Sequence, residues 1–287
     1  MTARQITLRD GRALGLSDLG DPIARRLVLL CHPSPGASEF DPDPLVTTQW
    51  GVRVIAPERP GYGASDPWRR DADASFWRHA DDVASYLRGV ERQAMMLEGV
   101  EYGAVGVVGW GAGGLVALAL AAQHPELVDQ AVVIDTPAPE HFPDEVAADA
   151  PFTPSMLGIS EREPGWLAAS DRVERMLKLA ARQGDAGVRG DQLAFADRDW
   201  LKRLDRVRAE TLLVYGEDHP EVSADIDGRW YRSRLLNART VRAEGAGLAI
   251  ATHWRKILAH VAPQHGDVPR SIRGSNRRKA RSATITA

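Results

Sequence analysis

The residues that could carry out a reaction begin at a glycine-rich turn, Gly109-Trp110-Gly111-Ala112-Gly113. The turn follows the apolar run 104–108 and precedes the helical run 115–122. In a Gly-x-Ser-x-Gly turn between a strand and a helix, the central serine is exposed as a nucleophile. Here the central residue is Gly111, which has no side chain with which to attack a carbonyl. The sequence therefore has the frame of a nucleophilic site without its nucleophile.

Two further stretches accompany this turn. The first is His32-Pro33-Ser34-Pro35-Gly36, and the second is RVIAPERPGYGASD over residues 53–66. Together with residues 108–126, and in this order, they resemble the α/β-hydrolase fold superfamily from about residue 4 to residue 262. The resemblance is to its esterases and lipases. It implies an α/β fold with a mostly parallel central sheet flanked by helices and a helical lid insertion.

The resemblance also implies a catalytic triad in the chain order Ser, Asp or Glu, His. Gly111 stands at the serine position, His219 at the acid position and Leu248 at the histidine position. Asp218, one residue before the acid position, is either a displaced acid or, as we favour, a solvated turn carboxylate. A leucine cannot move a proton, so three altered positions predict a chain that does not use this triad.

An oxyanion site is implied by the same resemblance, at the backbone N–H groups of Ser34 and Ala112. Such donors stabilise the negative charge that develops on a carbonyl oxygen, and they do not depend on the missing side chains. The helix expected after Ala112 adds positive potential at its N-terminus. We therefore expect a site that can polarise a carbonyl even without a nucleophile.

Four more side chains are candidates for the same pocket. His32 opens the oxyanion loop, where a purely structural role is the favoured alternative, and Trp110 is expected to shape the pocket or to pack. Asp135 ends a predicted strand and would either line the cavity or cap the next segment. His141 is a candidate general acid or base, with a structural role as the alternative.

The elements that must position these residues follow from apolar periodicity. An opening hairpin is expected at residues 6–8 and 13–16, and helices at 76–97, 229–236 and 250–261. Strands are predicted at 27–31, 52–56, 105–108, 131–134, 211–215 and 239–242. Strands that alternate with helices favour a parallel sheet covered on both faces.

Residues 137–200 contain no strand pattern. Val173, Met176, Leu177 and Ala180 have helical spacing, which predicts an amphipathic helix there. We therefore divide the chain into an α/β core (1–136 and 201–263), a helical lid (137–200) and a tail (264–287). The tail has six Arg or Lys residues against one Asp and is predicted to be disordered, with a weak nucleic-acid or anionic-surface role as the alternative.

Composition argues against several kinds of partner and cellular location. A net charge of −3 gives no reason to expect a nucleic-acid partner for the body of the protein. The single cysteine, Cys31, excludes an internal disulfide and is expected to be a buried apolar residue. The first 20 residues lack a signal-peptide pattern, and no apolar run could span a membrane. We expect a cytoplasmic protein with no membrane partner.

No metal or cofactor is expected, because paired histidines, Cys-x-x-Cys and phosphate-loop patterns are absent from the sequence. The partner predicted is a small, apolar, carbonyl-containing molecule. The leading hypothesis is a hydrolase-like protein without serine-hydrolase activity, either a lyase, cyclase or isomerase or a ligand-binding pseudoenzyme. The alternative is an ester or amide hydrolase with a displaced triad or a water nucleophile. The oligomeric state stays open.

Overall fold

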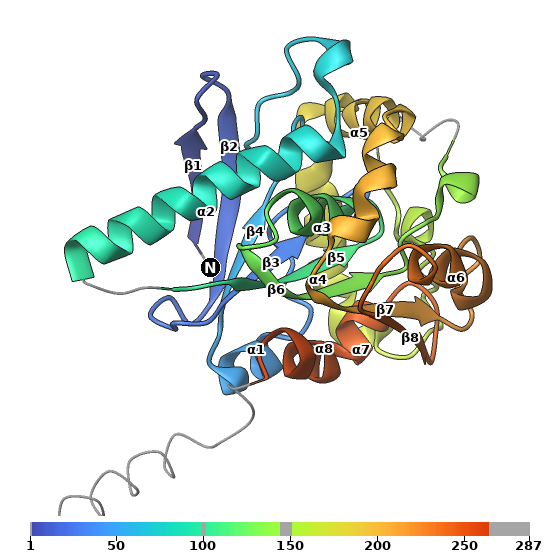
Figure 1. The fold of residues 1–287 in the computed structure, drawn as a ribbon. Helices are drawn as coiled ribbons and strands as arrows, with labels where there is room; N and C mark the ends of the chain where they lie inside the picture. Colours follow the sequence, from blue (N-terminus) through green and yellow to red (C-terminus); the bar gives the residue numbers. More distant parts are fainter. Residues whose placement is uncertain (1, 99–101, 144–150, 264–287) are drawn as a thin grey trace, which may run out of the picture.

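A computed structural model of the chain describes residues 2–98, 102–143 and 151–263. One eight-stranded sheet crosses the molecule in the order β1-β2-β4-β3-β5-β6-β7-β8 (Figure 1). The strands are β1 Thr2–Thr7, β2 Ala13–Gly20, β3 Leu27–Cys31, β4 Arg53–Pro57, β5 Val105–Trp110, β6 Val128–Ile134, β7 Glu210–Gly216 and β8 Ala238–Ala243. The pairs β1–β2 and β2–β4 are antiparallel, and the others are parallel. The predicted fold class is thus confirmed.

Helices cover both faces of this sheet. The α-helices are α1 Pro44–Trp50, α2 Phe76–Glu98, α3 Ala112–Gln123, α4 Trp166–Ala180, α5 Ala186–Ala196, α6 Arg229–Arg232, α7 Ala249–Thr252 and α8 Trp254–Val261. Figure 1 shows α2 and α3 on one face, with α1, α7 and α8 grouped on the other. Each face has its own apolar core, because successive side chains of a strand point to opposite faces. Val107 of β5, for example, packs with α3, whereas Val108 belongs to the other core.

Local sequence explains several element boundaries. The side chain of Asp43 accepts hydrogen bonds from the first backbone N–H groups of α1, Pro44 opens that helix, and Gly51 ends it in a left-handed conformation. This short helix was not among the predicted elements. Cys31 is buried, and burial raises the pKa of its thiol to about 12, so it serves as an apolar residue.

Between β6 and β7 the described residues form helices and turns without a strand. They comprise α4, α5 and the short helices Pro139–His141, Pro154–Leu157, Ala181–Gln183 and Asp199–Arg206. Val173, Met176, Leu177 and Ala180 are all buried on one face of α4, as their spacing predicted. We call residues 137–143 and 151–200 the inserted segment; that it acts as a lid stays a prediction.

Two predicted helices differ from the observed ones. The helix expected at 229–236 ends at Arg232, because the chain must turn to enter β8 at Ala238, and a π-helical turn, Ala224–Gly228, precedes it. The helix expected at 250–261 is two helices, which separate at His253. The predicted tail, 264–287, lies outside the described residues. No helix in the described part of the chain is both long and apolar enough to cross a bilayer.

Candidate active site

A cavity of about 310 Å³ lies at the carboxyl ends of β3, β5, β6 and β7. Ligands of open α/β sheets bind at this edge, because the loops that leave parallel strands converge there. Its walls are Pro33, Ser34, Pro35, Trp110, Gly111, Ala112, Asp135, Pro137, His141, Pro143, Met156, Leu157, Phe195, His219, Glu221 and Val222. Six of the predicted site residues and the acid-position residue His219 therefore share one cavity. His32, Asp218 and Leu248 are not among the lining residues.

Gly111 occupies the sharp turn between β5 and α3. Its backbone has φ 54° and ψ −123°, a conformation that glycine adopts without the penalty of a residue with a Cβ. Its N–H donates to the carbonyl of Ile134 at 2.8 Å, and Thr136 Oγ1 donates to its carbonyl at 2.8 Å. A Cβ at this position would meet only Pro33, at 3.4 Å. The turn thus has the geometry that presents a nucleophile, and its residue has none to present.

The two residues predicted to donate backbone N–H groups, Ser34 and Ala112, both line the cavity. Ala112 is the first residue of α3, and the residue before it, a glycine, makes no side-chain capping bond. The first N–H groups of a helix have no partner within the helix, so the positive end of α3 faces the cavity. Ser34 lies opposite, in the loop after β3, and also lines the cavity. A carbonyl oxygen bound between them would be polarised by both.

A buried ion pair fixes the Ser34 loop. The guanidinium of Arg59 is bidentate to Asp191 of α5, with both N···O distances at 2.7 Å, and it also donates to the carbonyls of His32 and Pro33. Tyr62 Oη donates to Asp191 at 2.7 Å and pairs with Ser34 Oγ at 3.1 Å. Both charged side chains are almost fully buried, which strengthens their attraction. The inserted segment and the oxyanion loop are therefore held by one cluster.

His32 serves this loop and not the cavity. Its Nδ1 bonds the carbonyl of Pro33 at 2.9 Å, and its Nε2 accepts the N–H of Arg59 at 3.0 Å. Burial and the neighbouring guanidinium hold the pKa of His32 well below its usual range. His32 therefore does not line the pocket, and it has the structural role that the sequence favoured, since both ring nitrogens bond backbone groups.

His219 and Leu248, which the sequence resemblance placed at the acid and histidine positions, make structural contacts. His219 Nδ1 accepts the N–H groups of Glu221 and Val222, its ring also bonds the backbone of Leu157, and burial lowers its pKa to about 4. Leu248 is fully buried in the core. Its N–H and that of Ala246 both donate to the Glu163 carboxylate, at 3.1 and 2.9 Å.

Asp218, the possible displaced acid, is exposed and does not reach the cavity. Its backbone N–H donates to the carbonyl of Gly245 at 3.0 Å. It corresponds to the solvated turn carboxylate that we favoured.

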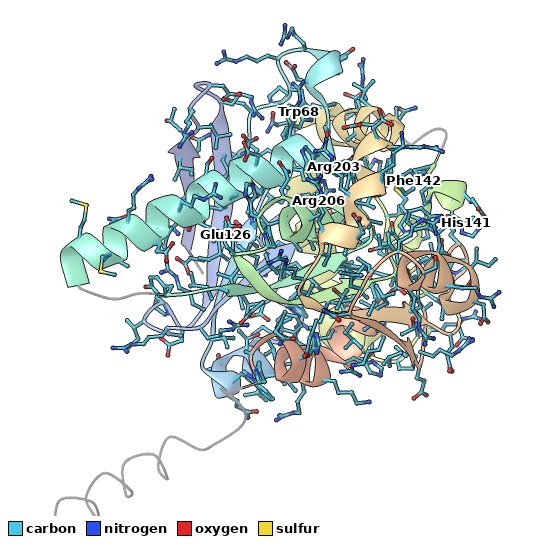
Figure 2. All side chains as sticks on the ribbon, in the orientation of Figure 1. Trp68, Glu126, His141, Phe142, Arg203 and Arg206 are labelled. Carbon is cyan, nitrogen blue, oxygen red and sulfur yellow. The ribbon has the colours of Figure 1, made fainter. Side chains whose placement is uncertain are left out.

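A histidine–carboxylate pair lies in the cavity wall. His141 Nδ1 donates to Asp227 Oδ1 at 2.8 Å, across 86 residues of sequence. Asp227 is fully buried, and the N–H groups of Ala138 and Ser223 also donate to it, at 2.7 and 2.8 Å. Figure 2 shows His141 beside α6, the helix that follows the turn bearing Asp227. A carboxylate on Nδ1 orients the ring and leaves Nε2 as a proton acceptor, the arrangement of a general base.

Asp135 follows β6 and has the only positive φ of a non-glycine among the described residues, 46°. Its Oδ1 accepts the N–H of Gly216 at 2.8 Å, and its Oδ2 is buried with no protein partner. Burial, together with the charge of Glu163, raises the pKa of Asp135 to about 7, although the Gly216 N–H opposes the rise. The cavity therefore holds a carboxyl group that can keep its proton near neutral pH.

Sequence reasoning missed three residues of this site: Asp227, Asp191 and Glu163. Asp227 lies two residues before the predicted helix 229–236, among several other acidic residues, and no local pattern marks it as buried. Asp191 and Glu163 belong to the inserted segment, whose position depends on tertiary contacts. The described residues contain no group of three or more His, Cys, Asp or Glu side chains that could hold a metal ion.

Comparison with known proteins identifies this architecture. A sequence model of the alpha/beta hydrolase fold matches residues 26–157, which run from β3 to the inserted segment. The chain has the α/β-hydrolase fold. The match covers the oxyanion loop, the Gly111 turn and Asp135, so the hydrolase-fold assignment rests on the residues that build the cavity.

Two of this chain's relatives by sequence are esterases. An esterase of Mycobacterium tuberculosis is 29% identical over 245 residues, with 77% of this chain and 72% of the relative covered. A pimeloyl-acyl-carrier-protein methyl ester esterase of Aromatoleum aromaticum is 28% identical over 236 residues, covering 69% and 81%. The solved epoxide hydrolase of Vigna radiata has a TM-score of 0.64 at 16% identity, covering 89% of this chain and 94% of that one. The last likeness shows the fold alone.

The buried ion pair predicts a large loss of stability when one partner is removed. We expect Asp191→Asn to lower the free energy of unfolding by about 3–5 kcal/mol, because Arg59 is left as an uncompensated buried charge. Asp185→Asn is the matched control, since Asp185 forms an exposed pair with Arg189 near the same helix and should cost under about 1 kcal/mol. Urea unfolding of both variants measures the two losses of free energy of unfolding. Equal losses would contradict the stabilising role of the buried Arg59–Asp191 pair.

The space around Gly111 predicts that a serine fits there. We expect Gly111→Ser to fold, with a loss of about 1–3 kcal/mol from its backbone conformation. In Gly113→Ser, by contrast, a Cβ would lie 2.1 Å from the carbonyl oxygen of Cys31, so this variant should be much less stable or insoluble. Thermal unfolding compares the two, and a Gly111→Ser chain that fails to fold would refute the geometry of the turn.

The raised pKa of Asp135 predicts a pH dependence of stability. Between about pH 4 and about pH 7 the folded state holds a proton that the unfolded state has released. The free energy of unfolding of the wild-type chain should therefore fall relative to Asp135→Asn as the pH rises through this range, and the difference should then stay constant. Urea unfolding of both proteins at several pH values tests this. If their free energies of unfolding change with pH in parallel, the pKa of Asp135 is not raised.

Proposed function

We propose that the cavity is the active site of an enzyme that acts on a small, uncharged carbonyl compound without forming a covalent acyl-enzyme. The substrate's carbonyl oxygen binds the backbone N–H groups of Ser34 and Ala112, and His141 acts as the general base. Asp227 holds the His141 ring. In this proposal Gly111, His219 and Leu248 stand where a triad would be and take no part in proton transfer.

The observation that carries this proposal is the His141–Asp227 hydrogen bond in the wall of the same cavity as the two backbone donors. A ligand-binding pseudoenzyme needs no such pair. Because Asp227 accepts three hydrogen bonds, it stays fixed, and it can stabilise the imidazolium that forms when His141 takes a proton. Convergent polar groups therefore favour an enzyme over a binding protein.

One reaction requires only His141 and the two backbone N–H groups. It is the removal of a proton from the carbon next to the carbonyl. His141 Nε2 takes that proton, and the electron pair of the C–H bond moves to the carbonyl oxygen as an enolate. The enolate oxygen is stabilised by the donors that would stabilise a tetrahedral oxyanion. Lyases, isomerases and cyclases that act on carbonyl compounds share this step.

A second candidate is direct ester hydrolysis, which the names of the esterase relatives favour. Here His141 takes a proton from a water molecule, and the water oxygen attacks the carbonyl carbon. The bond from that carbon to the ester oxygen then breaks, and the departing alcohol takes the proton from the His141 imidazolium. The space beside Gly111, where a Cβ would meet only Pro33, suits a water in place of a serine hydroxyl. This route also avoids an acyl-enzyme.

Exchange of carbon-bound protons tests the proposal and separates the two candidates. NMR in heavy water would follow deuterium entry next to the carbonyl of butanone, and release of methanol from methyl butyrate would measure hydrolysis. We expect exchange by the wild-type chain, and a decrease of about 10²–10⁴-fold in His141→Gln. Asp227→Asn should lose about 10²-fold or more and change the pH profile, because the ring loses its orienting partner.

The control variant is His253→Gln, a histidine outside the cavity, which should keep full exchange. Circular dichroism would verify that each variant is folded. Methanol release without exchange would replace the first candidate by the second. Neither reaction, or equal rates in wild type and His141→Gln, would contradict the proposed role of His141 and support the pseudoenzyme.

A further inference from the structure

One polar group of the cavity has no part in the proposed proton abstraction. The Oδ2 atom of Asp135 is buried and lacks a protein partner, whereas its Oδ1 accepts the N–H of Gly216. An unpaired buried carboxyl oxygen destabilises the folded state, and so does the positive φ of this non-glycine residue. Strained, unsatisfied groups persist mainly where function needs them, so this carboxyl is a candidate for contact with substrate.

The sheet places Asp135 next to the oxyanion donors. Ile134 pairs with Trp110 across the β5–β6 ladder, and the N–H of Gly111 donates to the carbonyl of Ile134. Asp135 and Gly111 are thus the next residues on two adjacent strands, which lie about 5 Å apart. A molecule whose carbonyl oxygen binds Ala112 would reach Asp135 with an atom only two or three bonds from its carbonyl carbon.

We infer that Asp135 is a second catalytic residue, a general acid that gives the proton on its Oδ2 to an oxygen leaving group at the carbon β to the substrate's carbonyl. This inference rests on the proposed role of His141. The substrate class becomes uncharged β-hydroxy or β-alkoxy carbonyl compounds, and the reaction becomes a β-elimination.

The bonds and protons of this step balance. His141 Nε2 takes the proton from the α-carbon, the electron pair forms the α,β double bond, and the bond from the β-carbon to oxygen breaks. The departing oxygen takes the proton from Asp135 and leaves as water or an alcohol. The imidazolium then returns its proton to the Asp135 carboxylate through solvent, and both groups regain their starting forms.

The surroundings of Asp135 stabilise the protonated form of its carboxyl group. Burial and the charge of Glu163 raise its pKa to about 7, whereas the Gly216 N–H lowers it. The other titratable groups near it are Tyr215 of β7, whose own pKa is raised by burial and by this carboxyl, and the cavity histidines His141 and His219. None of the lining residues is a lysine or arginine that would hold the carboxyl ionised.

Because no lysine or arginine is among the lining residues, we expect an uncharged substrate. Glu221 is the other carboxylate in the wall, and Asp227 lies behind His141. A substrate carboxylate would meet only negative or neutral groups, without an arginine or lysine to pair with. Uncharged esters and ketones are therefore favoured over free acids.

Methyl β-hydroxybutyrate is the probe, because α-deuterium entry, formation of methyl crotonate and release of methanol are followed on one molecule. We expect the wild-type chain to catalyse exchange and elimination, with elimination slowing as the pH rises above about 7. Asp135→Asn should keep exchange and lose elimination by about 10²–10⁴-fold, together with this pH dependence. Free β-hydroxybutyrate should be a much poorer substrate, and Asp218→Asn, an exposed carboxylate outside the cavity, should match the wild type.

Each outcome separates the two proposals. Exchange without elimination by the wild-type chain, or elimination unchanged in Asp135→Asn, overturns the role of Asp135 and leaves that of His141 intact. Loss of both reactions in Asp135→Asn assigns it a structural role and also overturns the inference. If the wild-type chain shows no exchange, infrared spectra test the protonation of Asp135 directly. A band of a protonated carboxyl near neutral pH that is missing in Asp135→Asn supports Asp135 as the acid. A wild-type spectrum without this band contradicts it.

Discussion

The site depends on how the chain is fixed where it leaves β6. Four successive residues, 135–138, are each held by a hydrogen bond from the β7–α6 region. Their partners are Gly216 N–H for Asp135, Tyr215 Oη for Thr136, Tyr231 Oη for Pro137 and Asp227 for Ala138. Because these groups are buried, each unsatisfied partner would cost about 1–3 kcal/mol. This clamp sets the position of Asp135 at one end and His141 at the other.

A second constraint acts across the cavity. The Arg59–Asp191 pair connects α5 to the loop that bears Ser34. The position of the Ser34 backbone therefore depends on the position of the inserted segment. The turn at Gly111 supplies the remaining wall, between the buried strand β5 and the buried residues of α3. In the proposed mechanism, the groups that bind the carbonyl are backbone atoms held by buried elements, whereas the side chains that transfer protons, Asp135 and His141, follow β6.

The sheet and the turn were predictable because their signals are local. Short apolar runs mark buried parallel strands, and the glycines around Gly111 mark a tight turn whatever lies elsewhere in the chain. The His141–Asp227 and Arg59–Asp191 pairs were not predictable, since 86 and 132 residues separate their partners and only the folded inserted segment brings them together. For His32 the motif left a pocket role and a structural role open, and the folded loop takes up both ring nitrogens, as the favoured structural role requires.

The central claim is that catalysis rests on the His141–Asp227 pair and not on the Gly111 turn. Nitrogen-15 NMR of the histidine rings tests it most directly, with His141→Gln to assign the signals. At a pH that keeps the ring neutral, the account predicts a proton on Nδ1, bonded to Asp227, and an Nε2 signal that shifts when butanone is added. A proton on Nε2, or an Nε2 signal that carbonyl compounds leave unchanged, would contradict it.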